Sequence, residues 1–226
     1  FVLRGAGSDE NGTEIYCPRP MMYLKDPESL AELREYLTTF DKRQREPENN
    51  VDLPFSQYAW SGGFIWTQIP GERVKSYLDK YEPEPNVLAK VSSGKMGDFT
   101  IHVSDVKNLK VGDVVELQLF NKDGENGEII KDLYQGAKVK PGSHHWKFPK
   151  LPIVRQQVEI TKISGSKITL KTPLTISIKT SYQAQLVEWK HLNEVGIEHL
   201  RFTFPDIPRV AHHVEPGNNG IFLTRL

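Results

Sequence analysis

The sequence GIEHLRF at residues 196–202 returns 24 residues later as GIFLTRL at residues 220–226. A repeat of this length with one strand in each copy is typical of solenoids, in which each coil buries its apolar face against its neighbours. The start of the chain has the same character, because VLR at residues 2–4 and TEIY at residues 13–16 flank a turn rich in Gly, Asp and Asn. We therefore expect the two ends of the chain to stack as successive coils, with the middle looping out.

The middle of the chain predicts a small antiparallel barrel or sandwich. Its clearest signal is a hairpin in which two alternating strands flank a tight turn at Gly165, where Gly supplies the positive φ that such turns demand. The predicted strands are residues 99–103, 158–163, 167–170 and 174–178, and residues 111–119 are predicted as a turn that leads into a strand.

One short helix is predicted over residues 27–40, where Asp-Pro-Glu at residues 26–28 starts a leucine-rich stripe at helical spacing. We expect three parts: β-helix coils with this helix and an aromatic-rich segment over 1–86, an inserted β domain over 87–190, and resumed coils over 191–226. Because both ends read as strand, we expect the chain to be an internal piece of a longer polypeptide.

Composition excludes some classes of protein. The 226 residues contain 29 Lys plus Arg and 29 Asp plus Glu, and a net charge of zero argues against a general nucleic-acid binder. With Cys17 as the only cysteine, the chain forms no internal disulfide. No apolar run approaches the ~20 residues of a membrane span.

The sequences VLRGAG at residues 2–7 and GTEI at residues 12–15 resemble the opening coil of pectate-lyase-like β-helix proteins. Residues 99–174 resemble, in scattered blocks, a β-insert common among those proteins, and residues 195–221 resemble the coil that follows it. The resemblance implies an all-β fold: a partial right-handed parallel β-helix with an inserted small antiparallel β-barrel-like domain and one short helix.

The resemblance also implies a secreted or cell-surface, carbohydrate-active protein. One reading is part of a polysaccharide lyase or glycoside hydrolase that acts on an anionic glycan, with its catalytic coils outside this chain. The alternative is a noncatalytic glycan-binding or structural surface module, including an adhesin or tailspike-like protein. The sequence leaves the enzyme question, the sugar and the oligomeric state open, because one fold serves many functions.

Candidate catalytic residues lie in AHHVEPGNN at residues 211–219. A lyase needs a base to remove the proton beside a uronic carboxylate and a cation to stabilise the enolate. In that reading His212 or His213 is the base or a metal ligand, and Glu215 is a ligand. The alternative is a turn whose His and Glu meet backbone groups or solvent, since the spacing matches no strong metal motif.

Candidate substrate-binding residues combine positive charge with aromatic rings, because lysines attract anionic sugars and indole rings stack on sugar faces. The first set is Lys140, His144, His145, Trp146 and Lys147, and the second is Trp60 and Trp66. The alternatives are a solvated loop for the first set and packing in a core hairpin for the second.

Calcium is the one cofactor for which the sequence offers oxygen ligands, at Asp9, Glu10, Asn11 and Asp98. The alternative is that these side chains cap backbone groups in turns. Any other metal or cofactor is left undetermined.

Overall fold

The computed structural model describes residues 1–24, 62–69, 84–122, 127–136, 151–207, 216–223 and 225. The chain divides into two compact units. The first unit comprises Phe1–Pro83 and Lys190–Leu226, and the second comprises Glu84–Trp189. The described residues are all-β apart from the α-helix α3 (Glu128–Leu133) and the short 3-10 helix η1 (Met21–Tyr23). The helix predicted over residues 27–40 lies outside them.

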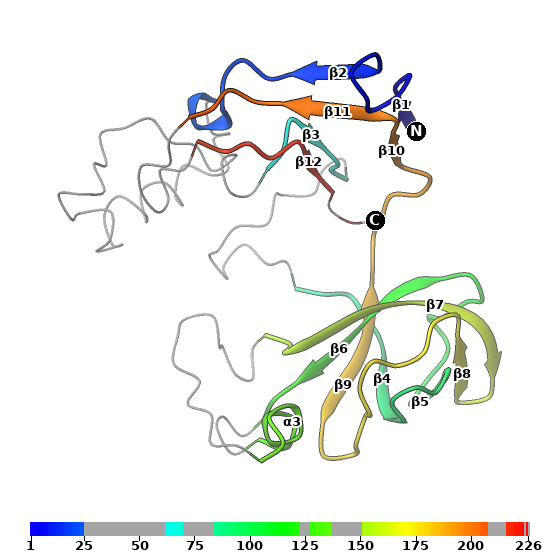
Figure 1. Cartoon of the computed structure of the whole chain (residues 1–226). Helices are drawn as coiled ribbons and strands as arrows, with labels where there is room; N and C mark the ends of the chain where they lie inside the picture. The colour runs from blue at the N-terminus through cyan, green and yellow to red at the C-terminus, as the bar shows by residue number, and fades with distance from the viewer. Residues whose placement is uncertain are drawn as a thin grey trace. The chain divides into compact units, whose positions relative to one another are not determined.

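In the described part of the first unit there are three two-stranded parallel sheets, and each joins a strand from residues 1–83 to one from residues 190–226 (Figure 1). As predicted, strands from the two ends of the chain lie side by side, and they pair in parallel. The pairs are β1 (Val2–Arg4) with β10 (Gly196–Glu198), β2 (Thr13–Tyr16) with β11 (Leu200–Thr203), and β3 (Ile65–Trp66) with β12 (Ile221–Phe222).

The 24-residue repeat is not a stack of neighbouring coils. The strand β10 pairs with β1, whereas β12 pairs with β3, so the two similar segments belong to different sheets. Residues 196–202 also form two strands instead of one, because His199 takes a φ of 58° and bends the chain between β10 and β11. Strands of two to four residues carry too little pattern to identify their partners.

Backbone hydrogen bonds extend the parallel pairing into the bends. The amide of Gly5 donates to the carbonyl of Glu198 at 2.9 Å, and that of Gly7 donates to His199 at 2.9 Å. A Cβ atom on Gly5 would lie 2.2 Å from the carbonyl oxygen of His199. The first glycine of VLRGAG is therefore required by the close approach of the two chain segments.

The second unit is a closed six-stranded antiparallel barrel with strand order β4-β5-β8-β7-β6-β9 (Figure 1). Closure pairs both edges of every strand and leaves none open. The predicted hairpin is present as β7 and β8, with Gly165 in the turn at a φ of 60°. The strands are β4 (Val87–Gly94), β5 (Thr100–Val103), β6 (Val114–Phe120), β7 (Val154–Ser164), β8 (Lys167–Leu170) and β9 (Gln183–Glu188).

The strand predicted over residues 174–178 is wrong. Only Ile178 makes a β-bridge there, to Gly94, while the amide of Thr175 donates to the side chain of Gln156 at 3.0 Å. A side-chain acceptor thus takes the place of a strand partner. The barrel gains β9 instead, whose sequence QAQLVE mixes amides with apolar residues and was not predicted as a strand.

The barrel encloses one apolar core. Its members alternate along the strands, as expected where one face of a sheet is buried. The fully buried side chains include those of Ile101, Leu117, Leu119, Ile160, Ile168 and Leu186. In the described part of the chain, no helix has the length and apolarity needed to cross a membrane.

Candidate functional site

The strand β6 is buried on both faces. Val115, Leu117 and Leu119 point into the barrel core, so Glu116 and Gln118 point to its outer face. Both polar side chains are nevertheless buried, with 2% and 3% of their surface exposed. Groups of this kind must find hydrogen-bond partners, because burial removes them from water.

The carboxylate of Glu116 has three such partners. It accepts from Gln118 Nε2 at 2.7 Å, from Gln157 Nε2 at 2.8 Å and from Arg155 Nη1 at 3.3 Å. The last contact is also an ion pair, and the Arg155 side chain is 33% exposed. The neighbouring strand β7 thus both neutralises and hydrogen-bonds the buried charge, and Gln118 of β6 itself adds a hydrogen bond.

These contacts belong to a row of polar side chains that crosses four neighbouring strands. Gln118 on β6 lies opposite Arg155 on β7 and Gln185 on β9, and Gln185 lies opposite Lys90 on β4. Gln185 Nε2 donates to Gln118 Oε1 at 3.0 Å. We call Arg155, Gln118, Gln185 and Lys90 the polar row.

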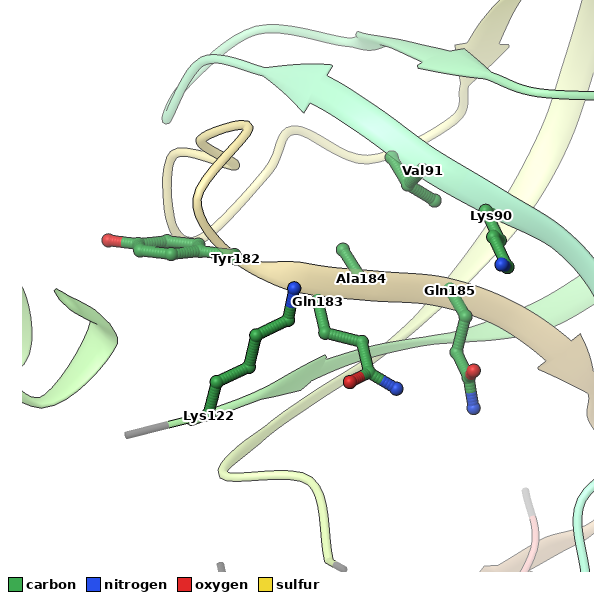
Figure 2. Close-up of a pocket in the computed structure, with 7 residues that line it drawn as sticks. All are labelled: Lys90, Val91, Lys122, Tyr182, Gln183, Ala184 and Gln185. Carbon is green, nitrogen blue, oxygen red and sulfur yellow. The ribbon is translucent and has the colours of Figure 1, made fainter. Parts of the chain in front are cut away.

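A pocket of about 360 Å³ lies at the Lys90 end of the polar row (Figure 2). Gln183 and Gln185 leave β9 on the same side, as residues two apart on a strand must, and the Lys122 side chain extends toward β9. Two buried apolar residues, Val91 and Ala184, also line the pocket.

Tyr182 forms a fixed part of the pocket wall. It is 6% exposed, and its hydroxyl donates to the carboxylate of Asp132 at the end of α3. The ammonium of Lys179 pairs with the same carboxylate at 2.6 Å and lies 6.0 Å from the Tyr182 ring centroid. These contacts hold the ring in place before any ligand arrives.

The groups that face the pocket keep free hydrogen-bonding capacity. Among the described residues, the side chains of Lys90, Lys122 and Gln183 contact no ion-pair or hydrogen-bond partner. All three are exposed. The described lining residues include no carboxylate, imidazole or thiol.

Most of the residues predicted as a site from sequence lie outside the described part of the chain. They are His212, His213, Glu215, Lys140, His144, His145, Trp146, Lys147 and Trp60. Their roles stay predictions.

Trp66 is described, and it lies on β3. Its ring is half-buried and packs edge to face with Phe222 on the paired strand β12, with ring centroids 5.5 Å apart. One edge of the indole therefore contributes to packing between the two parallel strands.

Of the residues considered as calcium ligands, Asp9, Glu10 and Asn11 belong to the first unit and Asp98 to the barrel unit. The carboxylate of Asp9 accepts the backbone N–H of Asn11 at 3.0 Å. Within the described ranges, no group of three or more His, Cys, Asp and Glu side chains is placed to hold a metal ion.

Sequence reasoning missed the polar row and the pocket. A signal was available, because glutamines recur at alternate positions of strand-like segments, at Gln183 and Gln185 and beside Glu116 at Gln118. Alternation predicts that such side chains share one face. It does not predict that this face is buried, or that four strands bring it together.

Comparison with known proteins gives only partial structural similarity. No model of a known protein family matches the sequence, and no curated protein is significantly similar to it.

Parts of the chain are similar to phage tailspikes. The Gp54 tailspike of Acinetobacter baumannii bacteriophage AP22, solved in complex with A. baumannii capsular saccharide, is 12% identical over 54% of this chain and 16% of that chain, with a TM-score of 0.34. The tailspike gp49 from Pseudomonas phage LKA1 is 16% identical over 62% of this chain and 18% of its own, with a TM-score of 0.31. The Pseudomonas phage phi297 tailspike gp61 is 16% identical, covering 55% and 18%, with a TM-score of 0.32. The matched parts thus make up less than a fifth of each tailspike.

Proposed function

We propose that this chain binds polysaccharide, and that the pocket at the end of the polar row is one of its contact sites. One observation carries the proposal: two ammonium groups and a glutamine amide, which contact no partner among the described residues, line the same pocket beside a fixed tyrosine. Hydrogen-bonding groups held ready in a concave site are what a polar ligand requires.

The chemistry of the lining fits sugar hydroxyls. A hydroxyl group both donates and accepts hydrogen bonds, and a glutamine amide offers a donor and an acceptor in one side chain. The ring of Tyr182, which lines the pocket, supplies apolar surface for the carbon face of a sugar ring.

We also propose that the three parallel pairs are parts of two successive coils of a right-handed parallel β-helix. The strands β1, β2 and β3 pair in the same order with β10, β11 and β12, always in parallel. Two turns of one spiral produce this pattern, and the barrel then forms an insertion between the coils. A polysaccharide ligand is consistent with a secreted or cell-surface location, which we include in the proposal.

Affinity electrophoresis through gels that contain a panel of neutral, uronic and sulfated polysaccharides tests the function. We expect at least one of them to retain the chain. Gln183→Ala is expected to weaken that retention about threefold to tenfold, because one hydrogen bond contributes about 0.5–1.5 kcal/mol.

Lys167→Ala is the matched control. Lys167 is also exposed, and its strand β8 lies three places from β9 in either direction around the barrel. Retention by every gel at the level of a non-binding protein would refute the proposed function. Equal losses of retention in the two variants would refute the proposed location of the binding site.

Cleavage of the polysaccharide is a separate prediction that depends on His212, His213 and Glu215. Incubation with uronic polysaccharides, monitored by the absorbance of unsaturated chain ends, tests it directly. Binding without new absorbance supports the noncatalytic alternative over the lyase.

A further inference from the structure

We propose that the buried side chain of Gln118 is a positioning residue for the pocket. It holds the amide of Gln185 in one orientation, which leaves the carbonyl oxygen of that amide to accept a hydrogen bond from a free hydroxyl group of a saccharide. The inference rests on the proposed function, and it adds which chemical group of the sugar this part of the pocket takes. It also predicts that the pocket discriminates against saccharides whose hydroxyl groups are capped as ethers or esters.

The orientation is set first at the carboxylate of Glu116, which is 2% exposed. An ionised carboxylate accepts hydrogen bonds and has no hydrogen to donate. The Gln118 amide therefore meets it with its NH₂ end, and Gln118 Nε2 lies 2.7 Å from Glu116 Oε1. Arg155 Nη1 donates to the same oxygen at 3.3 Å, and a guanidinium can only donate. Both neighbours of this oxygen thus require an acceptor.

The same restriction passes from Gln118 to Gln185. With its NH₂ group turned to Glu116, Gln118 offers the next strand its Oε1 atom, which is an acceptor. Gln185 meets that atom with Nε2, at 3.0 Å. Because Gln118 is 3% exposed, little water reaches it to replace either bond. The NH₂ end of the Gln185 amide is therefore turned toward β6.

The carbonyl oxygen is the end of the Gln185 amide that Gln118 leaves free. Gln185 lines the pocket, and among the described residues its Oε1 atom accepts no hydrogen bond. Gln183 leaves β9 on the same side (Figure 2), but no described residue fixes its amide, so it can turn either end to a ligand. The pocket thus combines one adaptable amide with one that requires a donor.

A saccharide hydroxyl group satisfies this requirement because it can donate, whereas a methyl ether or an acetyl ester offers only acceptors. A capped hydroxyl group that faces Gln185 Oε1 loses a hydrogen bond and gains no replacement. One hydrogen bond of this kind changes affinity by about threefold to tenfold. We therefore expect Gln118 to control how strongly the pocket prefers the free hydroxyl group, although Gln118 itself is not among the lining residues.

Gln118→Met is the test variant. Methionine is of similar length and flexible enough to fill the same space, and Glu116 keeps its donors Gln157 and Arg155. Gln157→Met is the matched control, because it also removes a donor of Glu116, at 2.8 Å, but lies outside the chain of bonds that leads to Gln185. Thermal melting of both variants verifies that the barrel is folded.

The first measurement needs no ligand. The NMR order parameter of the Gln185 side-chain NH₂ group reports how firmly Gln118 holds it. We expect a value above about 0.6 in the wild type and in Gln157→Met, and a lower value in Gln118→Met. Equal order parameters in the three proteins would overturn the positioning role.

The second measurement is isothermal titration of the intact chain with free and capped saccharides. One pair is dextran and O-methyl dextran, and the other is polygalacturonate and its O-acetylated form. The ratio of the two affinities within a pair is compared between proteins, so that the effect of the bulk of the cap cancels. We expect the ratio to fall about threefold to tenfold in Gln118→Met and to stay unchanged in Gln157→Met.

The possible results separate this inference from the function beneath it. If Gln118→Met leaves the ratio unchanged, or Gln157→Met lowers it equally, the inference is overturned while polysaccharide binding stands. If the wild type binds neither pair and no gel retains it, the proposed function fails, and the assigned hydroxyl group fails with it. The order parameter then still decides whether Gln118 positions Gln185.

Discussion

Gly5 shows how one residue controls the contact between segments far apart in the sequence. Its amide donates to Glu198, and the position of its missing Cβ lies 2.2 Å from the carbonyl oxygen of His199. Backbone atoms at that distance cannot move away without breaking the hydrogen bonds around them. Gly196 is different, since a Cβ there would meet Val2 at 3.5 Å, an ordinary contact.

We predict that Gly5→Ala lowers the free energy of unfolding of the first unit by about 1–3 kcal/mol, the usual cost of overpacking. The matched variant Gly196→Ala should change it by less than about 0.5 kcal/mol. Cys17 provides the measurement. It is buried, and burial raises the pKa of its thiol. The rate at which a thiol reagent labels Cys17 in urea therefore reports how readily this unit opens. Equal labelling curves for the two variants would contradict the prediction.

Glu14 is the residue for which the structure predicts a pH effect. A hydrogen bond from Thr203 and a second from Arg201, whose Nη2 lies 3.2 Å from the carboxylate, lower the pKa of Glu14. The ionised form is thus favoured in the folded state, so its stabilisation is present above the ordinary glutamate pKa of about 4.3 and is lost as pH falls through the lowered value.

The free energies of unfolding of wild type and Glu14→Gln should therefore differ at neutral pH and converge as the pH falls through the lowered pKa of Glu14. The size of the difference should shrink in an Arg201→Gln background, because one cause of the lowered pKa is then absent. An NMR titration of Glu14 that yields an ordinary pKa would disprove the assignment.

At the scale of elements, β6 illustrates why an alternating strand is ambiguous. Its sequence VVELQLF predicts one buried and one exposed face, but the flanking strands β7 and β9 bring Arg155, Gln157 and Gln185 over the second face. The polar side chains of β6 are therefore buried among hydrogen-bond partners. β6 also pairs with β9, the strand that carries several of the residues lining the pocket.

We predict that Glu116→Ala lowers the free energy of unfolding of the barrel by about 1–3 kcal/mol, since it leaves hydrogen-bond donors of Gln118 and Gln157 unpaired. Glu159→Ala on β7 is the control. Its carboxylate pairs with Lys171 at 2.6 Å but is 35% exposed, and such surface pairs contribute about 0–1 kcal/mol. Urea unfolding followed by circular dichroism compares them, and equal losses would show that burial of Glu116 has no energetic effect.

At the scale of the whole molecule, the two units differ in how the chain builds them. Every strand of the barrel comes from the single segment Glu84–Trp189, whereas each parallel sheet of the first unit needs both ends of the chain. The first unit therefore contains contacts of very large sequence separation, and closing them costs more chain entropy.

We predict that residues 84–189 produced alone fold into the same barrel, because the closed sheet satisfies its own backbone hydrogen bonds. Slow amide exchange in β6 and β9 and a cooperative thermal transition would confirm it. Rapid exchange throughout the isolated segment would show that the barrel depends on the rest of the chain.

The local features of this protein can be predicted from its amino acids: the hairpin around Gly165, the strands near residues 2, 13 and 100, the β-rich middle and the neutral balance of charge. Periodicity and turn chemistry act over a few residues, so they can be read from the order of amino acids alone. The same signals failed at residues 174–178, where the side chain of Gln156 contacts a backbone that would otherwise pair as a strand.

The pairing partner of each strand could not be predicted from the sequence and follows from the fold of the whole chain. In the fold, β12 pairs with β3, although the repeat in the sequence had predicted that it would stack on β10. The fold also places Lys90, Gln185, Gln118 and Arg155, which come from four strands, in one row. The physical reason is that pairing between short strands depends on closing long loops and a barrel. Those are properties of the whole chain that no single stretch of sequence contains.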